Sequence, residues 1–139
     1  MNKKQKSLTN KGFSLVELII VIAIMAVLIG VLAPQYLKYV QRSKISTDVT
    51  NAQEIASAIN VAIADDKVDI STIGITSGDD IAGGTAVSNI DGFTKIPISK
   101  VNKTYKWNIT FDSTNGVTGI TLGTYAIYPD ASAYEGASH

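Results

Sequence analysis

The feature that most constrains this chain is a stretch of twenty consecutive uncharged residues, 18–37, nearly all of them apolar. An α-helix rises about 1.5 Å per residue, so the stretch forms a helix of about 30 Å, the thickness of a bilayer's hydrocarbon core. The sequence therefore predicts one membrane-spanning helix. Four lysines and no acid precede Gly12, which favours a cytoplasmic N-terminus.

Two simpler interpretations explain this stretch only in part. A secretory signal peptide has a shorter apolar core and a small-residue cleavage site. Here Ala33 is followed directly by Pro34, and no Ala-x-Ala motif precedes it. A plain single-span anchor explains the length, but it leaves unexplained the carboxylate of Glu17 near the start of the helix.

Glu17 has two interpretations. A carboxylate within a spanning helix costs about 2.5–3.5 kcal/mol on membrane-insertion scales. In the first interpretation, Glu17 lies at the membrane surface, since it is close to the start of the run. In the second, it meets a cation of an adjacent copy when the protein assembles. Such a pair would offset the desolvation of both charges and would set the axial register between copies.

The segment KGFSLVEL, residues 11–18, resembles the class III signal of type IV pilins and pseudopilins. By this resemblance Gly12 is the residue before the prepilin peptidase cut, and Phe13 is the new, N-methylated N-terminus. Glu17 matches the assembly glutamate of the family, and Pro34 matches the proline that commonly follows the span. The resemblance covers about residues 11–37.

The resemblance implies an α+β pilin fold, in which a long N-terminal helix packs on a small antiparallel sheet. It divides the chain into a leader (1–12), an apolar transmembrane and filament-core helix (13–37), an amphipathic helix (38–66) and a globular body (67–139). The expected role is that of the major structural subunit of a type IV pilus-like filament, a role without catalysis or cofactor. The alternatives are a pseudopilin of type II secretion or DNA uptake, and a single-span membrane-anchored binding protein.

The family also implies partners and a location. The precursor is expected in the cytoplasmic membrane as a single-pass protein, where the prepilin peptidase and the pilus assembly machinery act on it. The mature subunit is then expected in a helical homo-oligomer on the cell surface, a setting associated with adhesion and twitching motility. No nucleic-acid site is expected, because without the leader lysines the chain has eight basic against twelve acidic side chains.

After Pro34 the chain is no longer uniformly apolar, and its apolar residues lie on one side of the expected helix. Apolar residues recur at spacings of three and four, which predicts one face of a helix that packs on a sheet. These residues are Ile45, Val49, Ala52, Ala56, Ile59 and Ile63, with Asp48 and Glu54 among the charges expected mainly off the stripe. We therefore expect one helix from Phe13 to about Ala64. Gly30 and Pro34 are expected to interrupt it, either as a simple kink or as a segment that unwinds in the filament.

The polar body begins with a loop and ends in strands. Residues 65–92 predict a long connection with one short strand or helical turn. Residues 103–112 alternate apolar and polar side chains, and the Asn115-Gly116 pair predicts a tight turn into further strands at 117–123 and 124–129. Residues 93–99 predict an additional strand, in which Pro97 is compatible only with an edge strand or with the start of a strand. Trp107 is expected in the core.

No set of residues in the body has a pattern typical of a catalytic or metal-binding site. The chain has no cysteine, which excludes disulfides, zinc thiolates and thiol nucleophiles. Asp79, Asp80 and Asp91 are the residues that a calcium site would use, but their spacing fits no EF-hand and solvated loop acids are the favoured interpretation. No metal site is therefore predicted. The single histidine, His139, is expected to be too close to the chain end to be held in a site.

Overall fold

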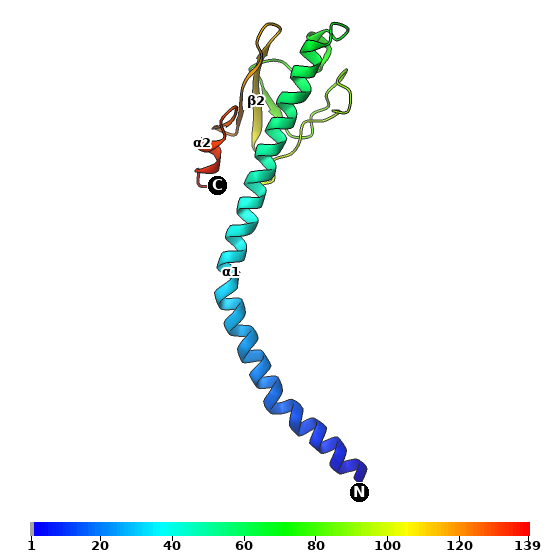
Figure 1. Ribbon diagram of the computed structural model, residues 1–139, viewed down its shortest axis with the longest axis vertical. Coiled ribbons are helices and arrows are strands. Elements are labelled where there is room, and N and C mark those ends of the chain that lie inside the picture. The colour runs from blue at the N-terminus through cyan, green and yellow to red at the C-terminus, as the bar shows by residue number, and fades with distance from the viewer. Residues whose placement is uncertain (1) are drawn as a thin grey trace. The chain divides into compact units, whose positions relative to one another are not determined.

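The structure is a computed structural model that describes the backbone of residues 2–139 and the side chains of residues 14–139. Its elements, in order, are α1 (Asn2–Ala64), η1 (Ile70–Thr72), β1 (Asp80–Ala82), β2 (Lys106–Asp112), β3 (Gly116–Leu122), β4 (Tyr125–Tyr128) and α2 (Ser132–Glu135) (Figure 1). The chain forms two compact units, Met1–Val40 and Gln41–His139. α1 ends at Ala64, as the sequence predicts.

α1 continues through Pro34 with helical backbone on both sides. Proline has no N–H, so the carbonyl of Gly30, four residues earlier, lacks its usual donor within the helix. Apart from its chain neighbours and the backbone of the adjacent helical turns, no atom lies within 4 Å of the position that a Cβ of Gly30 would take. The backbone is therefore not broken at these residues, although one hydrogen bond of the helix is missing there. Unwinding of this segment within a filament stays a prediction.

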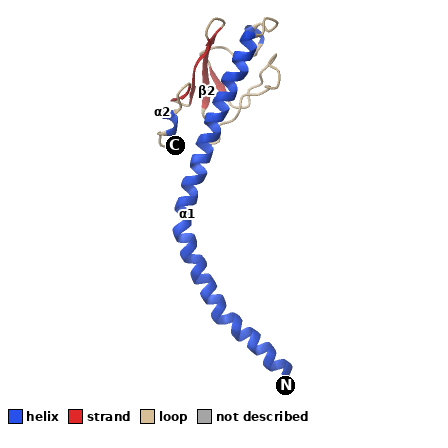
Figure 2. Ribbon diagram, viewed as in Figure 1, coloured by secondary structure: helices blue, strands red, loops and turns tan. Residues whose placement is uncertain are grey.

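The four strands form one antiparallel sheet in the order β1-β2-β3-β4. Figure 2 shows the sheet on one side of the C-terminal part of α1 and long loops on the opposite side of this helix. This arrangement confirms the predicted α+β class and the small antiparallel sheet. The connection between α1 and β2 contains one turn of 3₁₀ helix, η1, and one short strand, β1.

The predicted strand at residues 93–99 is wrong. This segment has only an isolated bridge between Ala86 and Lys95, and the edge of the sheet is β1 instead. The backbone of Ile96 pairs with the preceding loop: Gly84 N–H donates to its carbonyl (2.7 Å) and its own N–H donates to the carbonyl of Thr85 (2.9 Å). The segment thus satisfies its backbone groups outside the sheet.

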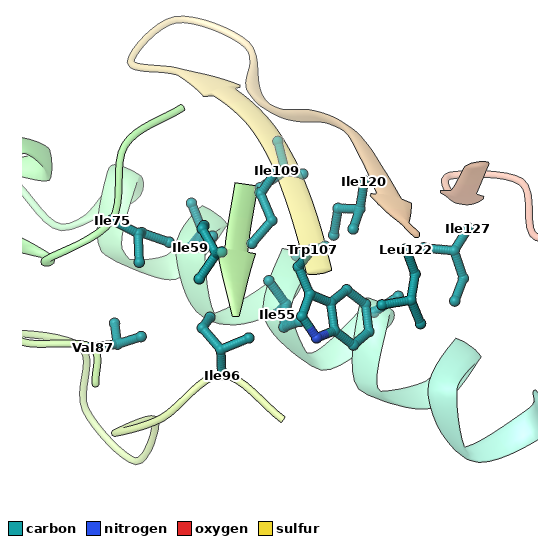
Figure 3. Close-up of a cluster of buried hydrophobic side chains, with 14 of the residues drawn as sticks. Ile55, Ile59, Ile75, Val87, Ile96, Trp107, Ile109, Ile120, Leu122 and Ile127 are labelled. Carbon is teal, nitrogen blue, oxygen red and sulfur yellow. The ribbon is translucent and has the colours of Figure 1, made fainter. Parts of the chain in front are cut away.

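The core lies between the sheet and the C-terminal half of α1 (Figure 3). Trp107 and Ile109 of β2 are fully buried, as predicted, and Nε1 of Trp107 donates to the carbonyl of Pro97 (2.8 Å). The buried apolar residues of α1 are Ala52, Ile55, Ala56, Ile59 and Ala62. The predicted stripe is therefore correct in direction, but it is wider than predicted, because Ile55 and Ala62 also belong to it.

Two predictions about polar residues are wrong. Asp48, expected mainly off the apolar stripe, is fully buried. It lies four residues before Ala52 and therefore on the same helical face. His139, expected not to be held, has its ring against Tyr134 with centroids 4.6 Å apart. Its Nε2 lies 2.8 Å from the carbonyl oxygen of Tyr134, and its Nδ1 lies 3.1 Å from the hydroxyl of Tyr105.

The hairpin between β2 and β3 is closed by a turn at the predicted position, and Gly116 has a φ of 75°. The N–H of Val117 donates to Oδ1 of Asn60 on α1 (2.9 Å), which ties the hairpin to the helix. A Cβ on Gly116 would lie 2.5 Å from that Oδ1. Glycine is therefore required here both by the backbone angle and by the close approach of α1.

We expect Gly116→Ala to destabilise the body by more than the positive φ alone, which costs about 1–2 kcal/mol. The added methyl group must displace Asn60 and weaken its bond to Val117. Gly78→Ala is the matched control, since Gly78 has a φ of 86° and no atom within 4 Å of the position that an added Cβ would take. Urea unfolding would measure both variants. Equal losses of unfolding free energy would show that the contact with Asn60 is unimportant.

Candidate assembly site on the apolar helix

The first part of α1 exposes an apolar surface along its whole length. Every described side chain from residue 14 to residue 39 is exposed. The most apolar 18-residue stretch of this helix has a mean hydropathy of 3.1, and none of it is buried. By length and composition the helix can therefore cross a membrane. A surface of this kind is not stable in water. It therefore needs lipid or other protein chains around it.

Glu17 is the only charged residue between Ser14 and Leu37, and it lies on this exposed surface. Its carboxylate has no hydrogen bond and no ion pair to any described residue. A carboxylate surrounded by apolar side chains is costly to desolvate unless it is paired.

Gly12 and Phe13, the two residues of the predicted cleavage site, lie outside the residues whose side chains the structure describes. Phe13 precedes Glu17 by four positions, about one helical turn. The structure therefore brings Glu17 and the apolar run together on one helix.

The aspartates that a calcium site would use do not converge. Oδ1 of Asp80 accepts a hydrogen bond from Nδ2 of Asn108 (3.1 Å), and all three aspartates are exposed. In the part of the chain with described side chains, no three residues of the types Asp, Glu, His and Cys are close enough together to hold a metal ion.

A groove of about 450 Å³ lies at the C-terminal end of α1, and Asp65, Asp69 and Asp91 are among the residues that line it. Its acids serve local turns. The N–H of Ser71 donates to Asp69 (3.0 Å) and lowers the pKa of that carboxyl, with a second contribution from the Ser71 hydroxyl. Asp65 likewise accepts from the N–H of Lys67 (3.0 Å). These contacts indicate a structural role for both carboxylates.

Comparison with known proteins starts with the N-terminal segment. Residues 8–33 match the family described as the prokaryotic N-terminal methylation motif. Over 117 residues the chain is 31% identical to a type IV major fimbrial protein, FimA, of Dichelobacter nodosus, and the match covers 84% of this chain and 72% of that relative. The chain belongs to the type IV pilin family. The similarity extends well past the apolar helix, so it includes most of the pilin's globular body.

Other relatives match over shorter regions. A fimbrial protein of Pseudomonas aeruginosa is 36% identical over 62 residues, which are 45% of this pilin and 40% of that relative. A prepilin peptidase-dependent protein A of Clostridium perfringens is 30% identical over 87 residues, 61% of this pilin and 62% of that relative. No solved structure gives a significant match.

Proposed function

We propose that this pilin is the major structural subunit of a type IV pilus-like extracellular filament. The observation that carries the proposal is the fully exposed apolar helix with its single carboxylate, Glu17. Such a helix is stable in a bilayer before assembly and among copies of itself afterwards. The similarity to major fimbrial proteins supports the same role.

Maturation begins in the cytoplasmic membrane. Lysines of the leader, residues 1–12, keep the N-terminus on the cytoplasmic side. The prepilin peptidase cuts between Gly12 and Phe13, and the new amine of Phe13 is methylated. The relative from Clostridium perfringens whose name states dependence on a prepilin peptidase supports this step. The apolar helix, residues 13–37, stays with the mature subunit.

Assembly pairs two charges that are unfavourable when separate. The α-ammonium of Phe13 in one subunit meets the carboxylate of Glu17 in its neighbour, and the apolar helices pack in the filament core. Each charge offsets the desolvation of the other, and a shift along the helix axis would separate them. The pair therefore sets register, while apolar contacts supply most of the stabilisation.

The roles of the remaining parts of the chain follow from this arrangement of subunits. The amphipathic segment, residues 38–66, carries the body, and the loop and sheet of residues 67–139 face water. Gly30 and Pro34 mark the place where the core helix unwinds when the filament is stretched, because the helix already lacks a hydrogen bond there. The role is structural, and it requires no cofactor, no metal and no nucleic acid.

Electron microscopy of material sheared from the native cells tests the filament role. We expect long surface fibres that an antibody against the body, residues 67–139, decorates along their whole length. Decoration at rare points only would indicate a minor subunit. Cells that lack fibres, and in which deletion abolishes secretion or DNA uptake instead, would assign the protein to the pseudopilins.

A further inference from the structure

A buried carboxylate connects three distant parts of the body. Asp48 of α1 is fully buried, and its carboxylate accepts four hydrogen bonds. The backbone N–H groups of Lys100 and Val101 donate to Oδ1 (2.7 Å) and Oδ2 (3.3 Å), respectively. The hydroxyls of Ser99 (2.6 Å) and Tyr134 (2.5 Å) both donate to Oδ2. The helix, the loop before β2 and α2 therefore share one anion.

The four donors of this cluster require a side chain that accepts hydrogen bonds and donates none. A carboxylate is such a group, whereas a side-chain amide has one oxygen and one NH₂. Each oxygen of Asp48 accepts from a backbone N–H, which cannot reverse its role. An asparagine in either orientation would therefore place its NH₂ against the N–H of Lys100 or Val101. Among the described residues Asp48 has no ion pair, so these donors alone compensate its burial.

Tyr134 is the link to the C-terminal segment. Its side chain is fully buried, and burial, with the hydrogen bond to Asp48, raises its pKa above the ordinary value. The hydroxyl is therefore held protonated, as a donor. The carbonyl of the same residue accepts from Nε2 of His139 (2.8 Å), and the two rings are in contact. Tyr134 thus connects Asp48 to the segment that follows it.

We propose that Asp48 is a clasp, a conformational device in which one carboxylate holds both the loop 99–101 and the C-terminal segment 131–139 on α1. The two segments are held through separate donors but through the same acceptor. The loop has three donors, whereas the C-terminal segment has only the hydroxyl of Tyr134. Loss of that hydroxyl therefore releases the C-terminal segment alone, and loss of the acceptor releases both. No disulfide can serve this purpose, because the chain has no cysteine.

The clasp also shapes the surface beside it. Glu135 follows Tyr134 and lines a groove of about 520 Å³ together with Arg42 and Val49 of α1. Because Tyr134 fixes the position of α2, it fixes that wall of the groove as well. Release of the C-terminal segment would remove this wall and expose the buried ring of Tyr134.

Hydrogen exchange of the full chain in detergent micelles, read by mass spectrometry, tests the clasp. Tyr134→Phe removes one donor. We expect the amides of Glu135, Gly136 and Ala137, which bond within and just after α2, to exchange at least about tenfold faster, with loop 99–101 unchanged. Asp48→Asn should accelerate exchange in both segments together.

Tyr125→Phe is the matched control. The ring of Tyr125 packs against Tyr134 with centroids 6.4 Å apart, but its hydroxyl has no hydrogen bond to any described residue. We expect its exchange pattern to be that of the wild type. Equal effects of Tyr125→Phe and Tyr134→Phe, or an Asp48→Asn variant that loosens only the loop, would overturn the proposal. If Asp48→Asn does not fold, the two tyrosine variants decide alone.

Discussion

Replacing Glu17 with alanine is expected to leave cleavage after Gly12 intact and to reduce the yield of surface filaments to less than about one tenth. The substitution leaves the ammonium of Phe13 in the neighbouring subunit buried without a partner. Loss of one member of a buried pair costs about 3–5 kcal/mol. A loss of that size per contact exceeds a hundredfold in the assembly equilibrium, at about 1.4 kcal/mol per factor of ten. Quantitative immunoblots of sheared and membrane fractions would measure both effects.

Glu54→Ala provides the control for this experiment. Glu54 is an exposed acid on the same helix, and it lies in the amphipathic segment, residues 38–66, rather than in the apolar run. Its removal changes net charge by the same amount and should leave filament yield near that of the wild type. A normal yield for Glu17→Ala would remove this residue from the assembly mechanism. A failure of processing in that variant would assign Glu17 to recognition by the peptidase instead.

Ile59→Ala is expected to destabilise the body by about 2–5 kcal/mol, because it removes a fully buried side chain from the face of α1 that covers the sheet. The loss has two parts, the transfer energy of the deleted carbons and the cavity that they leave. Trp107, the only tryptophan, is fully buried in the same core and reports unfolding by its fluorescence. Urea titration of the detergent-solubilised protein would give the change in unfolding free energy.

Val61→Ala is the comparison for Ile59→Ala, since Val61 lies two residues along the same helix but is 67% exposed. Its expected effect is below about 0.5 kcal/mol, as for most surface substitutions. If the two variants were equally stable, the sheet would not pack on the predicted face of α1 in solution.

The sequence predicted best those features that depend on long, regular patterns. The length of the apolar run, the end of the helix near Ala64 and the burial of Trp107 each follow from many residues that agree. The pairing of β2 with β3 was likewise predictable, because alternation on both sides of Asn115-Gly116 specifies a hairpin.

The missed features depend on contacts between segments that are distant in the sequence. Asp48 lies on the buried face of α1 by its spacing from Ala52, but a lone acid on a helix is usually solvated. Only the donors of the loop at 99–101 and of Tyr134 make its burial favourable. His139 is similar, because its partners lie on β4, α2 and the residue before β2.

The assignment of residues 93–99 to a strand failed for a different reason. Of the apolar residues of this segment only Ile96 is buried, and the backbone of the segment pairs with the loop at 84–87 rather than with the sheet. The close approach depends on Gly83, where a Cβ would lie 2.7 Å from the Cα of Ile98. The pattern of apolar residues in the sequence does not identify the partner of the backbone.

The most direct test of the proposed function is the intact mass of the subunit in filaments sheared from native cells. We predict a chain that begins at Phe13 with one methyl group on its amine, so that the lysine-rich leader is absent from every assembled copy. Filaments whose subunits still carry residues 1–12 would contradict the account, because the nitrogen of Phe13 would then be part of a peptide bond and could not neutralise Glu17.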